Sequence, residues 1–172
     1  GENPKYTQFF MDTVMSITPT GIKPYLVVQS KNWVQTKDFQ NKDFDKTDAL
    51  FYMREKNKVF GIRKLIEIQD AVFFTLEIND EYSNYYVFTS PRETRIFHRM
   101  LDDLVYKEER FVINDMVCSD GEGMYAISNP RLFADFAEQS MEETLKQDLD
   151  KRDQLLQLTE DSNPVIFYYA YK

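Results

Sequence analysis

Two residue types that carry much of enzyme chemistry are nearly missing from this chain. Its 172 residues include one cysteine, Cys118, and one histidine, His98. A single cysteine excludes an internal disulfide and a zinc site built from several cysteines. A nucleophilic Cys118 would need a base, and His98 is the one imidazole that could serve. We interpret Cys118 as a small buried hydrophobic residue of a strand rather than as half of a catalytic dyad.

Glycine, proline and long apolar runs are also scarce. Five glycines and six prolines argue against a disordered or fibrous chain. The apolar runs, such as 71–76, are far too short for a transmembrane span. No phosphate loop, serine nucleophile elbow or histidine cluster is present, so no cofactor is expected and catalysis is disfavoured. The formal net charge of −8 disfavours nonspecific binding to nucleic acid.

Aromatic residues are abundant, and their spacing predicts strands. Phenylalanine and tyrosine number 14 and 11, and both favour β structure. Alternating or continuous apolar patterns predict eight strands before residue 128, joined mostly by hairpin-sized turns. The predicted strands span 7–17, 22–30, 59–68, 71–78, 82–89, 94–100, 110–119 and 123–127. A short helix is predicted over 47–56. The four strands between 59 and 100 form an antiparallel meander, and the strands together suggest a sandwich, an open barrel or blades of a propeller.

The pattern changes near Ser128. Asn129 and Pro130 have the residue types that begin helices, and helical spacing of leucines, including Leu145 and Leu149, continues to about Leu158. The segment 165–171 then predicts a final apolar strand, which must pair with an earlier strand to satisfy its backbone groups. The sequence therefore predicts a mainly β fold with a helical segment over about 130–158 and a final strand.

Several segments together resemble a family of β-propellers. The run 10–17, followed by 22–25, looks like a recurrent blade segment. Further matching segments are 61–62, 65–67, 72–74, 85–88, 101–104 and 160–166. The chain is similar to the C-terminal part of the six-bladed β-propeller lipoproteins of Bacteroides-type bacteria, which are related to NHL-repeat propellers and include families of unknown function.

The resemblance carries expectations about architecture and location. A blade takes roughly 40 to 50 residues, so the chain matches two or three blades. It is then either a single β-rich domain over 1–172 or a piece of a longer propeller. The family implies an extracytoplasmic protein that is lipid-anchored in its precursor. A chain with too few blades to close a ring is expected to self-associate through uncovered apolar faces.

Two functions remain open at this point. The first is a non-catalytic binding or scaffold module for an unknown protein or glycan, with an aromatic platform formed by Trp33, Tyr82, Tyr85 and Tyr86. Aromatic residues at strand spacing are also typical of a core. The second is part of a calcium-dependent, lactonase-like hydrolase. Related enzymes of that type imply metal ligands, and the candidates are Glu67, Asn84, Asn114 and Asp115. The sequence has no closely spaced Asp/Asn loop, so no metal site is predicted.

Overall fold

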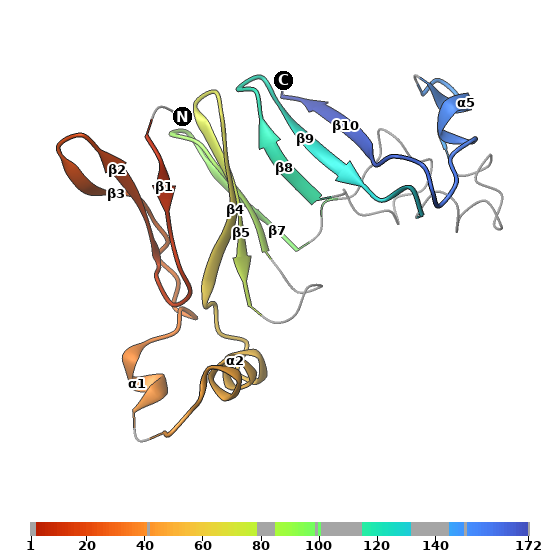
Figure 1. The fold of residues 1–172 in the computed structure, drawn as a ribbon. Helices are drawn as coiled ribbons and strands as arrows, with labels where there is room; N and C mark the ends of the chain where they lie inside the picture. Colours follow the sequence, from red (N-terminus) through yellow and green to blue (C-terminus); the bar gives the residue numbers. More distant parts are fainter. Residues whose placement is uncertain are drawn as a thin grey trace. The chain divides into compact units, whose positions relative to one another are not determined.

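The computed structural model describes residues 3–40, 42–78, 85–98, 100, 115–131, 145–149 and 151–171. Contacts divide the chain into two compact units, Gly1–His98 and Arg99–Lys172. The described residues form three antiparallel sheets, of three, four and three strands, with short helices between or after them. Figure 1 shows these strands with the helices α1, α2 and α5. The prediction of a mainly β fold is confirmed.

The first sheet has the order β1–β2–β3, with β1 at Lys5–Tyr6, β2 at Thr13–Thr18 and β3 at Gly21–Val27. Its β2–β3 turn ends at Gly21, whose φ is 125°. Glycine adopts this φ without strain, and other residues do not. The predicted hairpin is confirmed, but its first strand begins later than expected. Phe10, with φ 69°, interrupts the extended backbone, and its amide donates to the carbonyl of Phe60.

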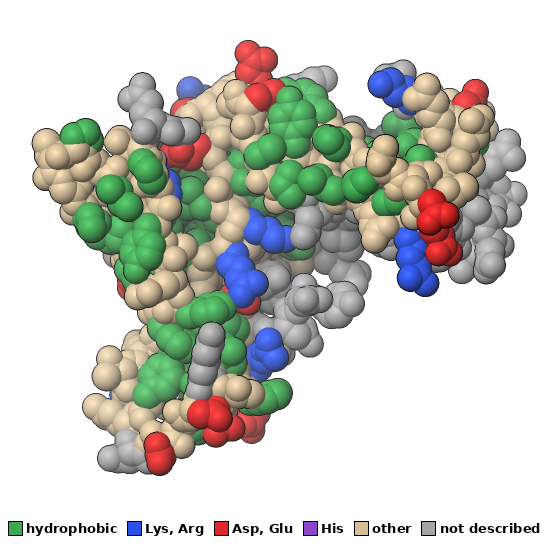
Figure 2. Space-filling view, in the orientation of Figure 1, with side chains coloured by type: hydrophobic (Ala, Val, Ile, Leu, Met, Phe, Trp, Pro, Cys, Tyr) green, Lys and Arg blue, Asp and Glu red, His purple; other side chains and the backbone are tan. Residues whose placement is uncertain are grey.

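One face of this first sheet is apolar and exposed. Tyr6, Ile17, Ile22 and Val27 each leave more than two fifths of their surface open. Figure 2 shows hydrophobic side chains gathered over the β2–β3 hairpin. Residues of the opposite face, Val14 among them, enter the core. The alternation of β2 therefore separates a core face from an uncovered face, as a period of two requires.

Two helices follow the first sheet. Helix α2, Lys46–Glu55, confirms the predicted helix and begins where the Asp45 carboxylate accepts the amide of Asp48 at 2.8 Å. Helix α1, Thr36–Phe39, was not predicted. It is a single turn, too short for apolar periodicity to reveal.

The second sheet is the predicted meander, in the order β4–β5–β6–β7. Its strands are β4 Gly61–Ile68, β5 Ala71–Glu77, β6 Tyr85–Thr89 and β7 Thr94–Phe97. A bulge in β4, where Lys64 has φ 53°, shifts the register against β5. Side chains on both faces of β5 are buried, as its continuous apolar run requires. The main core lies between the two sheets and α2, and includes Val14, Met53, Phe60, Phe74 and Val87.

The second unit contains a sheet in the order β10–β9–β8. The strands are β8 Asp115–Ser119, β9 Gly123–Ser128 and β10 Val165–Ala170. Asp120-Gly121 makes the predicted hairpin turn, with Gly121 at φ 95°. The final strand pairs along its whole length with β9, from Val165 opposite Ser128 to Ala170 opposite Gly123. The prediction that the C-terminal strand pairs with an earlier one is confirmed.

The predicted C-terminal helical segment is present but is interrupted within 145–151. Residues 132–144 lie outside the described part of the chain, but 145–149 are described and are not helical. A helix, α5, forms at Arg152–Leu155 after Lys151, whose φ of 59° prevents a helix from running through it. The interpretation of Leu145 and Leu149 as part of one continuous helical face is therefore wrong. Leu145 and Leu155 instead pack against the β10 residues Val165 and Phe167.

Candidate functional site

A cleft of about 510 Å³ opens in the first unit, beside the start of β2 and the segment that follows β3. This volume is within the range of small-molecule sites. Its lining is formed by Asp12, Val28, Gln29, Ser30, Lys31, Trp33, Val34 and Gln35. One of the four sequence-predicted binding residues, Trp33, therefore lies at a cleft.

Trp33 is fixed in place by the backbone around it. Residues 33 and 59 form a parallel bridge, and the amide of Val34 donates to the carbonyl of Val59 at 2.9 Å. The indole Nε1 of Trp33 donates to the carbonyl of Phe10 at 3.4 Å. The side chain is 6% exposed, so it forms a wall of the cleft and does not offer an open ring face. The structure assigns Trp33 to the core and to the cleft at once.

Polar groups supply most of the chemistry of the cleft. Asp12 accepts a hydrogen bond from the Thr13 hydroxyl at 2.7 Å, and its carboxylate has the capacity to accept further hydrogen bonds from a ligand. Gln29 and Gln35 carry amides that donate and accept, and Lys31 carries an ammonium. All four of these residues are exposed. The lining suits a small ligand with several hydroxyl or amide groups.

The other predicted aromatic residues do not join Trp33 in one platform. Tyr82 lies outside the described residues. Tyr85 and Tyr86 are neighbours on β6, so their side chains point to opposite faces of the sheet. The Tyr86 ring stacks on Phe73 at 6.3 Å between centroids, and the Tyr85 ring meets His98 at 4.2 Å. Both rings are half-buried packing partners.

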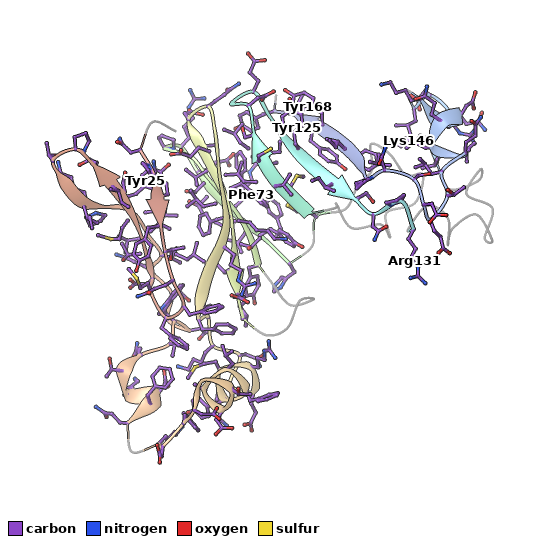
Figure 3. All side chains as sticks on the ribbon, viewed as in Figure 1. Tyr25, Phe73, Tyr125, Arg131, Lys146 and Tyr168 are labelled. Atoms are coloured by element: carbon purple, nitrogen blue, oxygen red, sulfur yellow. The ribbon has the colours of Figure 1, made fainter. Side chains whose placement is uncertain are left out.

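A polar cluster links the first two sheets. The hydroxyl of Tyr25 on β3 donates to Glu67 Oε1 on β4 at 2.6 Å, and Lys5 Nζ on β1 lies 3.4 Å from the same oxygen. Lys5 Nζ also sits 4.4 Å from the centre of the Tyr25 ring. Figure 3 labels Tyr25 in the first sheet. The three side chains satisfy one another and connect β1, β3 and β4.

The cluster changes the acidity of two of its members. Burial raises the pKa of Tyr25, and the hydrogen bond to Glu67 and the charge of Glu67 raise it further. Burial also opposes ionisation of Glu67, but the Tyr25 hydroxyl and the Lys5 ammonium outweigh it and lower the Glu67 pKa. Glu67 is therefore an ionised carboxylate held by a phenol and an ammonium.

The candidate metal ligands of the hydrolase hypothesis do not assemble within the described residues. Asn84 and Asn114 lie outside them, and Asp115 begins β8 in the second unit. Glu67 already accepts from Tyr25 and pairs with Lys5, a cation that would repel a second cation. No group of three or more His, Cys, Asp or Glu side chains in the described residues could hold a metal ion.

Cys118 differs from its interpretation as a buried residue. It lies on β8 and is exposed, because the bulge between Met116 and Cys118 changes which residues of that strand face inward. Met116 is buried in its place. His98 belongs to the other unit, where its ring contacts Tyr85.

No pattern in the sequence pointed to the polar residues of the cleft. Asp12, Gln29 and Gln35 come from two segments on either side of the β2–β3 hairpin, and no motif connects them. A usable signal was the polar stretch after residue 28, which carries Trp33 as an isolated aromatic anchor. Such a stretch indicates a loop that folds back on the core, but it does not indicate which residues lie across the cleft from it.

Comparisons with known proteins identify a fold. No family model matches the chain, and no curated protein matches its sequence. No helix within the described stretches has the length and apolarity needed to cross a bilayer. The chain matches the crystal structure of a "Putative exported protein" from Bacteroides fragilis, with a TM-score of 0.69 and 13% sequence identity. The match covers 100% of this chain and 48% of that one, so the chain spans about half the length of the Bacteroides fragilis protein.

Proposed function

We propose that this chain is a non-catalytic, extracytoplasmic binding module that takes a small, neutral polar ligand in the cleft beside Trp33. The observation that carries the proposal is the cleft itself, about 510 Å³ lined by Asp12, Gln29, Lys31, Gln35 and Trp33. Convergent polar groups beside a buried aromatic wall are typical of sites that bind through hydrogen bonds and apolar contact together. A mono- or disaccharide has this combination of groups.

The extracytoplasmic location rests on two supports. The Bacteroides fragilis protein with the same fold bears a name that describes it as exported. The segments quoted above resemble lipoprotein propellers, which implies a lipid anchor in the precursor. From the same resemblance we further propose that these sheets are two to three blades of a larger propeller.

The sole tryptophan provides a direct test. Because Trp33 lines the cleft, its fluorescence reports on a ligand bound there. We expect a saturable change in emission when the chain is titrated with glucose, mannose or N-acetylglucosamine, or with their disaccharides. Gln35→Ala and Asp12→Asn should each weaken binding about threefold to tenfold, the value of one net hydrogen bond.

The control is Gln157→Ala, which removes an equally exposed amide from the second unit. It should leave both the affinity and the emission change intact. If none of these sugars alters Trp33 emission up to millimolar concentrations, the cleft is not a saccharide site and the proposal is wrong. If Gln157→Ala weakens binding as much as Gln35→Ala, the ligand does not occupy the cleft.

A further inference from the structure

A pair of tyrosines in the second unit forms a surface distinct from the cleft. Tyr125 on β9 and Tyr168 on β10 are directly opposite each other in the register. Figure 3 shows both side chains beside one another on these strands. Their ring centres are 4.9 Å apart and the ring planes are tilted by 44°. The two rings therefore contact each other at an angle, with Tyr168 exposed and Tyr125 half-buried.

Gly123 sets the position of the Tyr168 ring. A Cβ on Gly123 would lie 2.7 Å from the ring atoms Cε2 and Cζ, closer than atoms can approach. The absence of that Cβ lets the ring lie against the backbone of β9. Tyr168 nevertheless remains 47% exposed. One side of the ring is supported by the sheet and the remainder is open to solvent.

The carboxylate of Asp120 lies at the edge of this aromatic pair. Its Oδ1 accepts the amides of Glu122 and Gly123, each at 2.9 Å, which fixes the carboxylate on the hairpin turn. Its Oδ2 accepts the Tyr125 hydroxyl at 2.9 Å. The backbone amide of Glu122 and then the hydroxyl of Tyr125 lower the pKa of Asp120, and the hydrogen bond to Asp120 raises the pKa of Tyr125. The carboxylate is therefore charged, oriented and open to solvent.

These features define the chemistry of a ligand. A pyranose sugar presents C–H groups on its faces, which suit the electron-rich faces of tyrosine rings, and hydroxyl donors around its rim. The Asp120 carboxylate beside the rings already accepts from two amides and from the tyrosine hydroxyls, so it keeps at most one lone pair for such a donor. A proline-rich peptide would cover the rings but offer Asp120 no hydroxyl donor. The charges of Asp120 and Glu122, which also act on Tyr168, oppose an anionic ligand.

We propose that Tyr125, Tyr168 and Asp120 form a binding platform for a neutral pyranose unit of a glycan. The platform shares no residue with the Trp33 cleft, because its residues lie on the sheet of the second unit. It therefore stands whether or not the cleft binds a ligand. Each site has its own variants, so the failure of one proposal is distinguishable from the failure of the other.

The test uses matched neutral and acidic oligosaccharides. Calorimetric titrations of the full chain with mannohexaose, cellohexaose and xylohexaose should detect binding of at least one. The β-1,4-mannuronate hexasaccharide has the mannan backbone with carboxylates, and it should bind at least tenfold more weakly than mannohexaose. Tyr168→Ala should weaken binding about tenfold, as expected for loss of one aromatic contact.

Two further variants separate ring stacking from other causes. Tyr168→Phe keeps the ring and should retain most of the affinity, and Asp120→Asn should weaken binding while keeping an acceptor for the turn. Ile166→Ala is the matched control, since Ile166 is two residues away on the same face of β10 and is 65% exposed. Melting curves establish that each variant is folded.

Three outcomes would overturn the platform. One is that no neutral hexasaccharide binds the folded chain. Another is that Ile166→Ala weakens binding as much as Tyr168→Ala, which would indicate a general apolar surface such as a protein interface. The third is that Gln35→Ala abolishes all oligosaccharide binding while Tyr168→Ala leaves it unchanged, which would assign the whole signal to the cleft.

Discussion

The strands β5 and β10 are both rich in apolar residues but have very different surroundings. The runs are Ala71 to Leu76 in β5, where Thr75 is the one polar residue, and Val165 to Ala170 in β10. In β5, consecutive side chains from Phe73 to Leu76 are buried. In β10, exposed positions alternate with buried or half-buried ones, and Ile166 and Tyr168 are on the exposed side.

The difference lies in what covers the two faces of each strand. Phe74 and Leu76 on one face of β5 belong to the main core, and Phe73 on its other face is 2% exposed. The inner face of β10 packs on the leucine cluster around Leu145 and Leu155. Figure 2 shows hydrophobic side chains on the visible surface over β8–β10. An apolar run thus predicts a strand, but it does not predict how many faces of that strand are covered.

Among the changes that test this comparison, removal of β10 should have the largest effect on stability. Deletion of residues 165–172 removes the partner of β9 and the wall of the leucine cluster. Each large buried side chain is worth roughly 1.5–3 kcal/mol, against a total stability of about 5–15 kcal/mol. We expect the second unit to unfold or the chain to become insoluble, as judged by soluble yield and thermal melting. An unchanged melting temperature would mean that β10 adds nothing to the sheet.

Replacement of a large buried side chain in β5 by a small one should have the next largest effect on stability. Phe73 is 2% exposed, so Phe73→Ala should cost about 3–5 kcal/mol of unfolding free energy, measured by urea denaturation. Phe51→Ala, at a position that is 62% exposed on α2, is the matched control and should change little. Equal losses for the two variants would contradict the burial assigned to β5.

Glu67 tests whether charge, in addition to apolar packing, holds the first two sheets together. Its folded pKa is lowered, so its contribution to stability is present above the pKa of an unfolded glutamate. That contribution is lost as the pH falls through the folded pKa. Glu67→Gln should lower stability at neutral pH by about 1–3 kcal/mol, as for a hydrogen bond to a charged group.

The same variant should flatten the acid limb of the stability curve, measured by urea unfolding from pH 7 to pH 3. Glu160→Gln changes an exposed carboxylate of the second unit and serves as the control. A variant curve parallel to that of the unchanged chain would show that Glu67 contributes no pH dependence.

The smallest effect is expected on the exposed face of β10. Ile166→Ala should change the unfolding free energy by no more than about 0.5 kcal/mol, because the side chain is 65% exposed. Sedimentation of the same variant is also informative, since self-association through this face should weaken when Ile166 is shortened. A loss of stability comparable to that of Phe73→Ala in a monomeric chain would mean that β10 is covered on both faces.

Local signals predicted the elements that depend on local physics. The Asp120-Gly121 turn, the β4–β7 meander and the pairing of the final strand follow from turn chemistry, period and the need to satisfy backbone groups. Helix α1 has too few residues to produce a pattern. The leucines at 145 and 149 have helical spacing, but their burial is achieved by turns against β10. The spacing of apolar residues indicates which side chains are buried, but it does not determine whether the backbone between them is helical.

The sites depended on contacts between distant segments. Trp33 was predicted as a binding residue and lines the cleft, while Tyr85 and Tyr86 are separated by the alternation of one strand. The sequence predicted Tyr168 only as part of the apolar final strand. Its register opposite Tyr125, and the space over Gly123, bring it beside Asp120.

By itself, the sequence determined that the chain forms antiparallel strands, where most of them turn, and that its end must pair. These properties arise from side chains a few residues apart, whose alternation and turn preferences act within one segment. The tertiary structure decided which apolar faces are covered, which tyrosines remain open and which polar groups surround Trp33. Those outcomes depend on register and packing between segments far apart in the chain, and no local pattern specifies either.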